Sequence, residues 1–185
     1  SSEHSAEYMP HWIKRQYPEL IDQYNIPLDE YPRRCENQIA GWEKMRDELV
    51  NDTKLKHTRS HEYGSLIMEA IETDVPAHIG GNVLNTGLIT NLPETMAVEV
   101  PCLVDHNGVQ GCHVGALPEV CAALNRTNVN VHLLTVEAAV TRRKDAVYHA
   151  ALLDPHLRSE LTIDQTVNLC NDLIKAHGKM LPRFR

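Results

Sequence analysis

The sequence predicts an α+β fold that is mainly helical and carries a small mixed or antiparallel sheet. Three observations predict it. Apolar residues recur at helical spacing between residues 35 and 49, and other long stretches behave similarly. The alternating run Ala97-Val98-Glu99-Val100 is typical of a half-buried strand. The turn sequence Asp105-His106-Asn107-Gly108 follows it and predicts an antiparallel hairpin.

The N-terminal part of the chain is expected to be helical. Pro18 suits the first turn of a short helix over residues 19–24. Asp29 is a candidate cap for a longer helix that runs to about Val50, with Pro32 near its first turn. The apolar face of this helix is expected to comprise Cys35, Ile39, Trp42, Met45 and Leu49. Residues 51–59 are polar and predict a loop. We therefore expect a helical arm over residues 1–52 and an α+β body over residues 58–185.

The predicted body begins with a helix that starts near Ser60, and strands follow it. The first strand is expected over 75–83, ending near Gly80-Gly81, and the second over 96–104. The return strand is expected over 109–114. The Asn-Gly pair in the connecting turn favours the primed turn types.

Helices are expected again from Leu117-Pro118 onward. The interval 125–130 is rich in asparagine and predicts an interruption, after which a long helix spans 131–153 and is stopped by Pro155. Thr162 with Gln165 three residues later is a candidate capping box for a last helix over 163–176. Gly178 can close that helix.

Composition excludes several classes of function. The formal net charge of −7 gives no reason to expect nucleic acid as a partner. No apolar run approaches the roughly 18–20 residues that would span a bilayer, and the sequence has no signal-peptide pattern. The five cysteines are scattered without a C-x-x-C zinc pattern, which favours free thiols in a reducing cytoplasm. Among them, Cys112 stands beside His113 in a glycine-flanked segment.

The segment from Asn85 to Pro101 is unusual for core sequence. Gly87 and Pro93 bracket a short apolar pair, and Asn85 and Asn91 flank it. Glycine permits positive φ and asparagine tolerates it, so the segment predicts a tight polar turn that leads into a strand. Such a turn can present amide side chains at a binding site or shape a subunit contact.

This turn and several other motifs, in matching order, resemble glycoside hydrolase family 4, and most closely its α-galactosidases. The resemblance covers nearly the whole chain, which begins where the nucleotide-binding half of the family has ended. It implies a C-terminal domain like that of lactate dehydrogenase, without the N-terminal Rossmann domain. The other motifs are Glu7-Tyr8-Met9-Pro10-His11-Trp12, Leu28-Asp29-Glu30-Tyr31-Pro32-Arg33-Arg34-Cys35, Val147-Tyr148-His149, Asp154-Pro155-His156 and Asp172-Leu173-Ile174-Lys175-Ala176-His177-Gly178.

The resemblance implies an enzyme that hydrolyses α-galactosides with NAD and Mn²⁺. In the family mechanism NAD takes a hydride from C3 of the sugar, a base removes the C2 proton, and the aglycone leaves by elimination. Water then adds and the hydride returns. The implied partners are an α-galactoside, the N-terminal Rossmann half of the same protein and further copies of it. Three alternatives remain open: an α-glucosidase, a 6-phosphoglycosidase, and a non-catalytic interaction module.

The resemblance aligns Tyr8 with the catalytic tyrosine of the family, although a tyrosine near an exposed arm is ordinarily a packing residue. A tyrosine hydroxyl has an ordinary pKa of about 10, so a tyrosine base needs positive charge nearby. Arg34 stands seven residues before Gly41, as the substrate-binding arginine of the family precedes a glycine. Arg33 is the alternative if the register is shifted by one, and Asn85 and Asn91 are further candidates for substrate contact.

The chain alone is expected to bind neither NAD nor metal. It contains no G-x-G-x-x-G run after a strand. The family's metal ligands, a cysteine and a histidine, belong to the preceding half, and no segment here matches either motif. The histidines to test are His4, His11, His57, His61 and His78, but no acidic or cysteine partner stands at set spacing from them.

Overall fold

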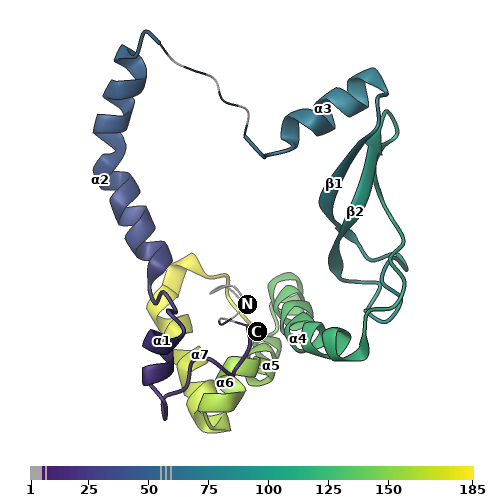
Figure 1. Cartoon of the computed structure of the whole chain (residues 1–185). Helices are drawn as coiled ribbons and strands as arrows, with labels where there is room; N and C mark the ends of the chain where they lie inside the picture. The colour runs from purple at the N-terminus through teal and green to yellow at the C-terminus, as the bar shows by residue number, and fades with distance from the viewer. Residues whose placement is uncertain (1–5, 7, 55, 57, 59) are drawn as a thin grey trace.

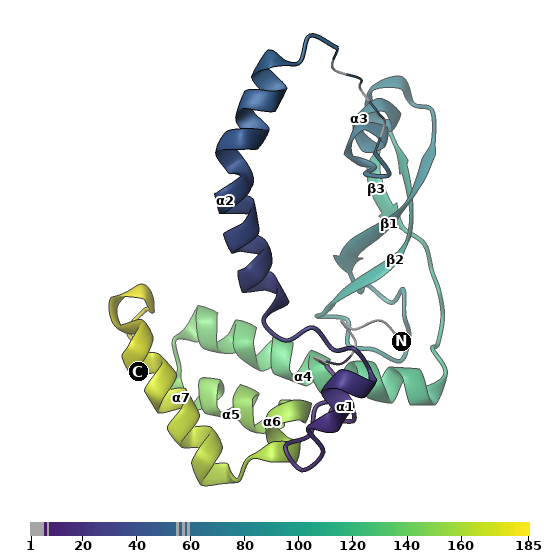
Figure 2. The ribbon, with the colours of Figure 1, turned by 60° about the vertical axis from the view of Figure 1, so that its left-hand side comes forward.

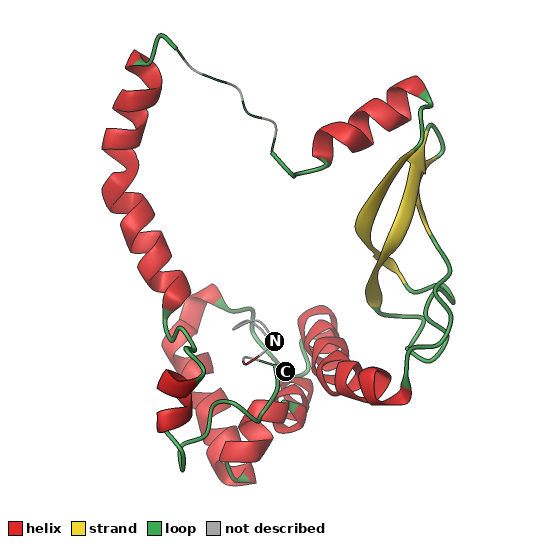
Figure 3. Ribbon diagram, viewed as in Figure 1, coloured by secondary structure: helices red, strands yellow, loops and turns green. Residues whose placement is uncertain are grey.

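The computed structural model describes residues 6, 8–54, 56, 58 and 60–185. It confirms the α+β fold, in which a small sheet (yellow in Figure 3) accompanies the helices. The three strands of the sheet are antiparallel and lie in the order β1-β2-β3. Prediction and structure agree on short α1 and on a sheet placed between long helices. The elements in chain order are α1 (Glu19–Gln23), α2 (Glu30–Asn51), α3 (Gly64–Thr73), β1 (Ala77–Leu84), β2 (Ala97–Asp105), β3 (Gly108–Gly111), α4 (Glu119–Thr141), α5 (Lys144–Leu153), α6 (Pro155–Glu160), α7 (Ile163–His177) and the 3₁₀ helix η2 (Gly178–Met180).

The elements form two groups joined by long α4 (Figure 1). Helices α4, α5, α6 and α7 gather at one end with α1 beside them, and α3 with the sheet stands at the other. A view turned by 60° shows the same two groups (Figure 2). Within the described part of the chain, no helix is long and apolar enough to cross a membrane.

The main core lies between α3, the sheet and the start of α4. It comprises Ala70, Ile79, Ile89, Leu92, Val98, Val100, Cys102, Val104 and Ala122. Strand β1 was expected to end near Gly80-Gly81 but continues to Leu84. A Cβ at position 81 would lie 2.7 Å from Cys102 Sγ, so this glycine admits the neighbouring strand rather than ending its own.

The hairpin falls where the sequence predicts, but its turn is of another kind. In the turn between β2 and β3, positive φ occurs only at Gly108, at 95°. A primed two-residue turn would need positive φ at a central residue, here His106 or Asn107. The Asp105 carboxylate accepts instead from the Asn107 amide at 2.8 Å and holds the turn. Strand β3 ends at Gly111, earlier than expected.

Helix α2 projects from the helical group, and its residues are exposed or only half-buried (Figures 1 and 2). Ile39 is 76% exposed and Trp42 is 52% exposed. The helix has the predicted extent, but Asp29 makes no side-chain cap and has φ 56°. The predicted apolar face therefore exists as a surface stripe that nothing in the described chain covers.

The largest differences from expectation lie in the C-terminal helices. Helix α4 runs without interruption through residues 125–130, where Asn125 donates to the carbonyl of Cys121 at 2.9 Å. The expected long helix over 131–153 is instead broken after Thr141, because Arg142 adopts a left-handed conformation with φ 58°. Pro155 does not merely stop α5 but begins α6.

The last helix confirms its predicted signals. Thr162 Oγ1 accepts from the Gln165 amide at 3.3 Å, and the Gln165 side chain accepts from the Thr162 amide at 2.9 Å. Gly178 closes α7 with φ 50°. The helix therefore begins at Ile163, one residue after the capping threonine.

Candidate functional site

Tyr8 lies in an arm of irregular backbone that precedes α1, here called the tyrosine arm (residues 8–18). Its side chain is 52% exposed. The Asn128 side chain, on α4, donates to the Tyr8 carbonyl at 3.4 Å. This long hydrogen bond crosses 120 residues of sequence. The phenol is thus presented to solvent while its backbone rests against α4.

The base of the tyrosine arm is fixed to the end of α6 through Glu160. Lys14 Nζ lies 3.3 Å from Glu160 Oε1, and the Arg15 amide donates to Glu160 Oε2 at 3.3 Å. The Arg15 guanidinium also donates to the Glu160 carbonyl at 2.6 Å. The bond from the Arg15 amide first, and then the Lys14 ammonium and the positive charge of Arg15, hold the pKa of the Glu160 carboxyl below its ordinary value.

Trp12 adds an apolar contact to the arm. Its ring packs edge-on against Tyr24 with centroids 4.9 Å apart and planes at 73°. Two buried nitrogens in this region, Trp12 Nε1 and His156 Nδ1, have no hydrogen-bond partner within the described chain. His156 belongs to α6, the helix that Glu160 ends.

Arg34 lies on the first turns of α2. Its guanidinium is 3.9 Å from Glu30 Oε1, one turn earlier on the same helix, and its side chain is 70% exposed. Arg33 donates instead to the Leu28 carbonyl at 2.9 Å. Of the two candidates, Arg34 therefore has the guanidinium that is freer to reach a ligand, because its one partner among the described residues is Glu30, in a long and exposed ion pair.

Asn85 is fully buried and is committed to its own loop. Its amide nitrogen donates to the carbonyls of Ile89, Leu92 and Pro93 at 3.0, 3.0 and 3.1 Å. Its oxygen accepts from the Ile89 amide at 2.8 Å. The expectation that Asn85 contacts substrate thus finds no support in the geometry, because both polar atoms already serve the backbone.

Asn91 also organises the loop. It donates to the Leu117 carbonyl at 2.8 Å and accepts from the Leu117 amide at 2.9 Å. This reciprocal pair fixes the loop to the segment that leads into α4. Gly87 has φ 81°, as the turn prediction required. The loop is therefore a rigid connector between the sheet and the helical group, and its asparagines hold its shape.

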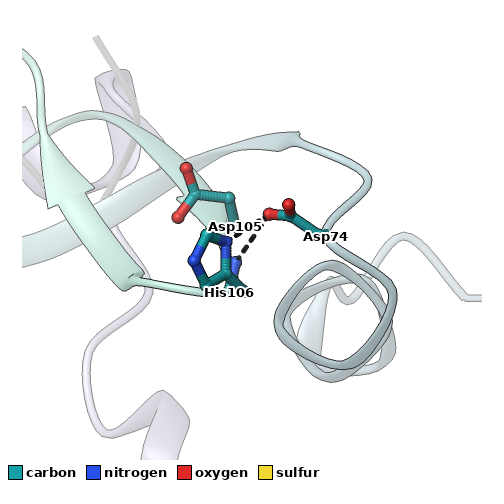
Figure 4. Close-up of side chains that lie close together, drawn as sticks. All are labelled: Asp74, Asp105 and His106. Carbon is teal, nitrogen blue, oxygen red and sulfur yellow. Dashed lines mark hydrogen bonds and ion pairs between the residues drawn. The ribbon is translucent and has the colours of Figure 1, made fainter.

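One group of metal-ligand residue types occurs among the described residues: Asp74, Asp105 and His106 (Figure 4). His106 Nδ1 lies 2.5 Å from Asp74 Oδ1, which also accepts from the His106 amide at 3.3 Å. The pairing raises the pKa of His106 and lowers that of Asp74. The geometry is that of an exposed ion pair that joins the β2–β3 turn to the end of α3.

The remaining candidates are dispersed. His11, His61 and His78 are exposed, while His4 and His57 lie outside the described residues. Cys112 is exposed, and the neighbouring His113 ring nitrogen lies 3.1 Å from the Gly87 carbonyl oxygen. An apolar cavity of about 440 Å³ lies between α4, α5, α7 and the C-terminal tail, lined in part by Cys170, Leu173 and Phe184. In the part of the chain that the structure describes, no hydrogen bond or ion pair connects Tyr8, Arg34, Asn85 and Asn91 to one another.

Sequence reasoning missed Glu160 and Asn128. Neither residue stands in a motif, and their partners lie 145 and 120 residues away in the chain. The sequence gives no local signal for such contacts. These contacts form because the fold brings the tyrosine arm next to α4 and α6.

Comparison with known proteins gives a consistent assignment. Residues 2–157 match the model of the family 4 glycosyl hydrolase C-terminal domain. The chain is 60% identical over all 185 residues to an α-galactosidase of Bacillus subtilis (strain 168), of which it covers 43%. It is 30% identical over 198 aligned positions to an α-galactosidase of Rhizobium meliloti (strain 1021), of which it covers 39%. The chain thus spans less than half the length of these relatives.

The fold is shared with solved structures. A 6-phospho-α-glucosidase from gut microorganisms, determined in complex with NAD and Mn²⁺, matches with a TM-score of 0.70. The identity is 22%, and the match covers 82% of this chain and 36% of that protein. At this identity the likeness shows a common fold.

Proposed function

The chain belongs to glycosyl hydrolase family 4, whose C-terminal domain it contains, and from this premise we propose that it is the C-terminal part of an α-galactosidase. The observation that carries the proposal is the 60% identity to an α-galactosidase over the full length of the chain. The reaction is hydrolysis of an α-galactoside, with oxidation at C3 of the sugar, proton removal at C2 and elimination of the aglycone.

Tyr8 is the proposed base that removes the C2 proton. Three features support this role: its phenol is half exposed, its backbone is held against α4, and the motif around it resembles that of the family. A general base must come within hydrogen-bond reach of the proton that it abstracts. The tyrosine arm can present the phenol oxygen in this way because the Tyr8 side chain is half exposed and, within the described part of the chain, its hydroxyl makes no hydrogen bond.

Arg34 is the proposed substrate-binding residue of this chain. A guanidinium offers several donors in a planar fork, which suits vicinal sugar hydroxyls. Its present partner, Glu30, is 3.9 Å away on the exposed side of α2, so exchange for a ligand costs little. Asn85 and Asn91 support the site indirectly by fixing the connector loop.

We propose that this chain alone binds neither NAD nor Mn²⁺. The sequence lacks a Gly-rich dinucleotide fingerprint. In the described group of metal-ligand residue types, Asp74, Asp105 and His106, the imidazole of His106 is already paired with the carboxylate of Asp74. We assign the binding of both cofactors to an N-terminal Rossmann half. Hydride transfer is assigned to the same half. Titration calorimetry of the 185-residue chain with NAD is expected to show no saturable binding, and clear binding near micromolar NAD would contradict this assignment.

The same proposal assigns this chain to subunit assembly in the cytoplasm. The exposed stripe on α2 and the apolar residues on α4, such as Val136 and Val140, provide surface that an N-terminal half or a second copy could cover. Sedimentation of the isolated chain at micromolar concentration is expected to show association, and a compact monomer alone would count against it.

Activity on defined sugars tests the function directly. The chain joined to its N-terminal half, supplied with NAD and Mn²⁺, is expected to cleave p-nitrophenyl α-galactoside in preference to the α-glucoside and to both 6-phosphates. Preference for the α-glucoside or a phosphorylated sugar would reassign the substrate within the family. No cleavage of any of the four would favour a non-catalytic interaction module.

A further inference from the structure

We infer that Glu160 is a positioning residue for the proposed reaction: it clamps the base of the tyrosine arm and so holds Tyr8 in place. This inference rests on the proposed role of Tyr8. Glu160 lies 145 positions after Arg15 in the sequence and stands in no motif.

The tyrosine arm needs an external clamp because it has no regular secondary structure. Between Tyr8 and Pro18 the arm forms one internal backbone hydrogen bond, from the Tyr17 amide to the Lys14 carbonyl at 3.1 Å. A segment with so few internal bonds keeps a single conformation only through contacts with the rest of the protein. The conformation of the arm is therefore set by its polar contacts with α4 and α6 and by the packing of Trp12 on Tyr24.

Glu160 supplies the densest of these contacts. Its side chain is 16% exposed, and it receives Lys14 Nζ on one carboxylate oxygen and the Arg15 amide on the other. Its carbonyl, at the last residue of α6, receives the Arg15 guanidinium. A helix end leaves such carbonyls without intrahelical partners, so Arg15 fills a position that the fold leaves open.

The clamp is itself rigidly placed. Helix α6 is fixed at its other end by Asp154, whose carboxylate accepts from the amides of His156 and Leu157 at 2.9 and 2.8 Å. Lys14, Arg15, Tyr17, Ser159 and Glu160 also line a small polar hollow of about 210 Å³. The arm thus meets α6 at one point, where two cations and a backbone amide converge on one carboxylate.

The role follows from the distance between clamp and phenol. Lys14 stands six positions after Tyr8, and the only other polar contact described between that stretch and the helices is the 3.4 Å bond from Asn128. Trp12 packs on Tyr24, which caps the C-terminal end of α1, so this contact joins the arm to the element that follows it directly in the chain. Loss of the Glu160 carboxylate therefore removes the contacts of Lys14 and of the Arg15 amide, and leaves at the base of the arm the bond from the Arg15 guanidinium to the backbone carbonyl at position 160. The base of the arm is loosened, and the remaining polar contact of the stretch that carries Tyr8 is the 3.4 Å bond from Asn128.

The rate of cleavage by trypsin measures directly how firmly the arm is held. Trypsin cleaves after lysine and arginine, and Lys14 and Arg15 both contact Glu160. In the full-length enzyme, Glu160→Ala is expected to raise the rate of cleavage after Lys14 by about 10-fold, since local release governs proteolysis. Cleavage after Arg15 is expected to rise less, because its guanidinium keeps the backbone carbonyl at position 160 as a partner. Glu160→Gln keeps an acceptor for the Arg15 amide and should show a smaller rise. Asp145→Asn removes an exposed ion pair with Arg143 on α5 and serves as the matched control, with cleavage unchanged.

Kinetics connect the clamp to Tyr8. Glu160→Ala should lower kcat by about 10-fold while KM changes less, because misplacement of a reacting group acts on the chemical step. In a Tyr8→Phe background the same substitution should cost no further turnover, since its effect passes through the tyrosine. A loss that adds fully to that of Tyr8→Phe, or wild-type cleavage and turnover in Glu160→Ala, would overturn the inference.

The failure of the proposed function is distinguishable from the failure of the clamp. Wild-type turnover in Tyr8→Phe would remove the tyrosine as base and leave the proteolysis to decide whether Glu160 holds the arm. Unchanged cleavage after Lys14 and Arg15 in Glu160→Ala would disprove the clamp whatever the identity of the base.

Discussion

Asn85→Ala should be among the most destabilising single substitutions in the chain. The side chain is fully buried and makes four hydrogen bonds with loop backbone, at 2.8–3.1 Å. Each is worth about 1 kcal/mol net, and the substitution leaves the Ile89 amide and the Leu92 carbonyl without another partner in the described chain, whereas the Ile89 and Pro93 carbonyls still accept from backbone amides. The expected loss in the free energy of unfolding is therefore about 3–5 kcal/mol, or roughly 6–20 °C in Tm for a chain of this size.

Two companion variants make the Asn85 prediction specific. Asn85→Asp keeps the acceptor for the Ile89 amide but loses the donor, and it places a carboxylate against three carbonyl oxygens, so it should destabilise at least as much. Asn82 is exposed on β1, and Asn82→Ala should change stability by less than about 0.5 kcal/mol. Urea unfolding followed by circular dichroism measures all three. A loss below about 1 kcal/mol for Asn85→Ala or Asn85→Asp would refute the reasoning.

Three further predictions concern other elements. The pKa of His106 is raised, so the stabilisation from its pairing with Asp74 is fully present below pH 6.5 and is lost as pH rises through the raised pKa. The pKa of Asp74 is lowered, so the stabilisation that its carboxylate contributes is present above pH 3.8 and is lost as pH falls through the lowered pKa. Asp74→Asn should return the His106 titration, followed by NMR, to its ordinary range; an unchanged titration would show that the pair does not form in solution. Arg142→Gly should stabilise by about 1 kcal/mol in thermal unfolding, because glycine accepts φ 58° without strain, and a lower Tm would contradict this. In the full-length enzyme Arg34→Ala should raise KM about 10-fold with little change in kcat; if Arg33→Ala does so instead, the register moves by one.

Local signals predicted the parts of the fold that local chemistry decides. The Thr162–Gln165 capping box and the short helix after Pro18 depend on neighbours within a turn, and both are as expected. The break between α4 and α5 was missed, because an arginine at φ 58° carries no glycine or proline signal. The pair Gly80-Gly81 wrongly predicted the end of a strand, because the glycine at position 81 is explained by close packing against Cys102 in the neighbouring strand.

The candidate site was predictable in its residues but not in their surroundings. The sequence predicted Asn85 as a substrate contact because it is a polar residue in a tight turn, but the side chain is buried and its amide donates to carbonyls of the loop. Arg34 and Tyr8 are exposed, as a substrate contact requires, yet the sequence could not show what holds Tyr8. Contacts such as Arg15 with Glu160 join distant segments and depend on the assembled fold.

The central claim is that Tyr8 removes the C2 proton, and solvent exchange at C2 in the full-length Tyr8→Phe enzyme tests it most directly. Folding and NAD binding should remain near wild type, because the substitution removes one half-exposed hydroxyl. Turnover should fall by about 10²–10⁴-fold, the range typical of losing a general base, and deuterium exchange at C2 should slow with it. Wild-type turnover and exchange would contradict the claim and direct the search to Tyr17, Tyr24 and Tyr31.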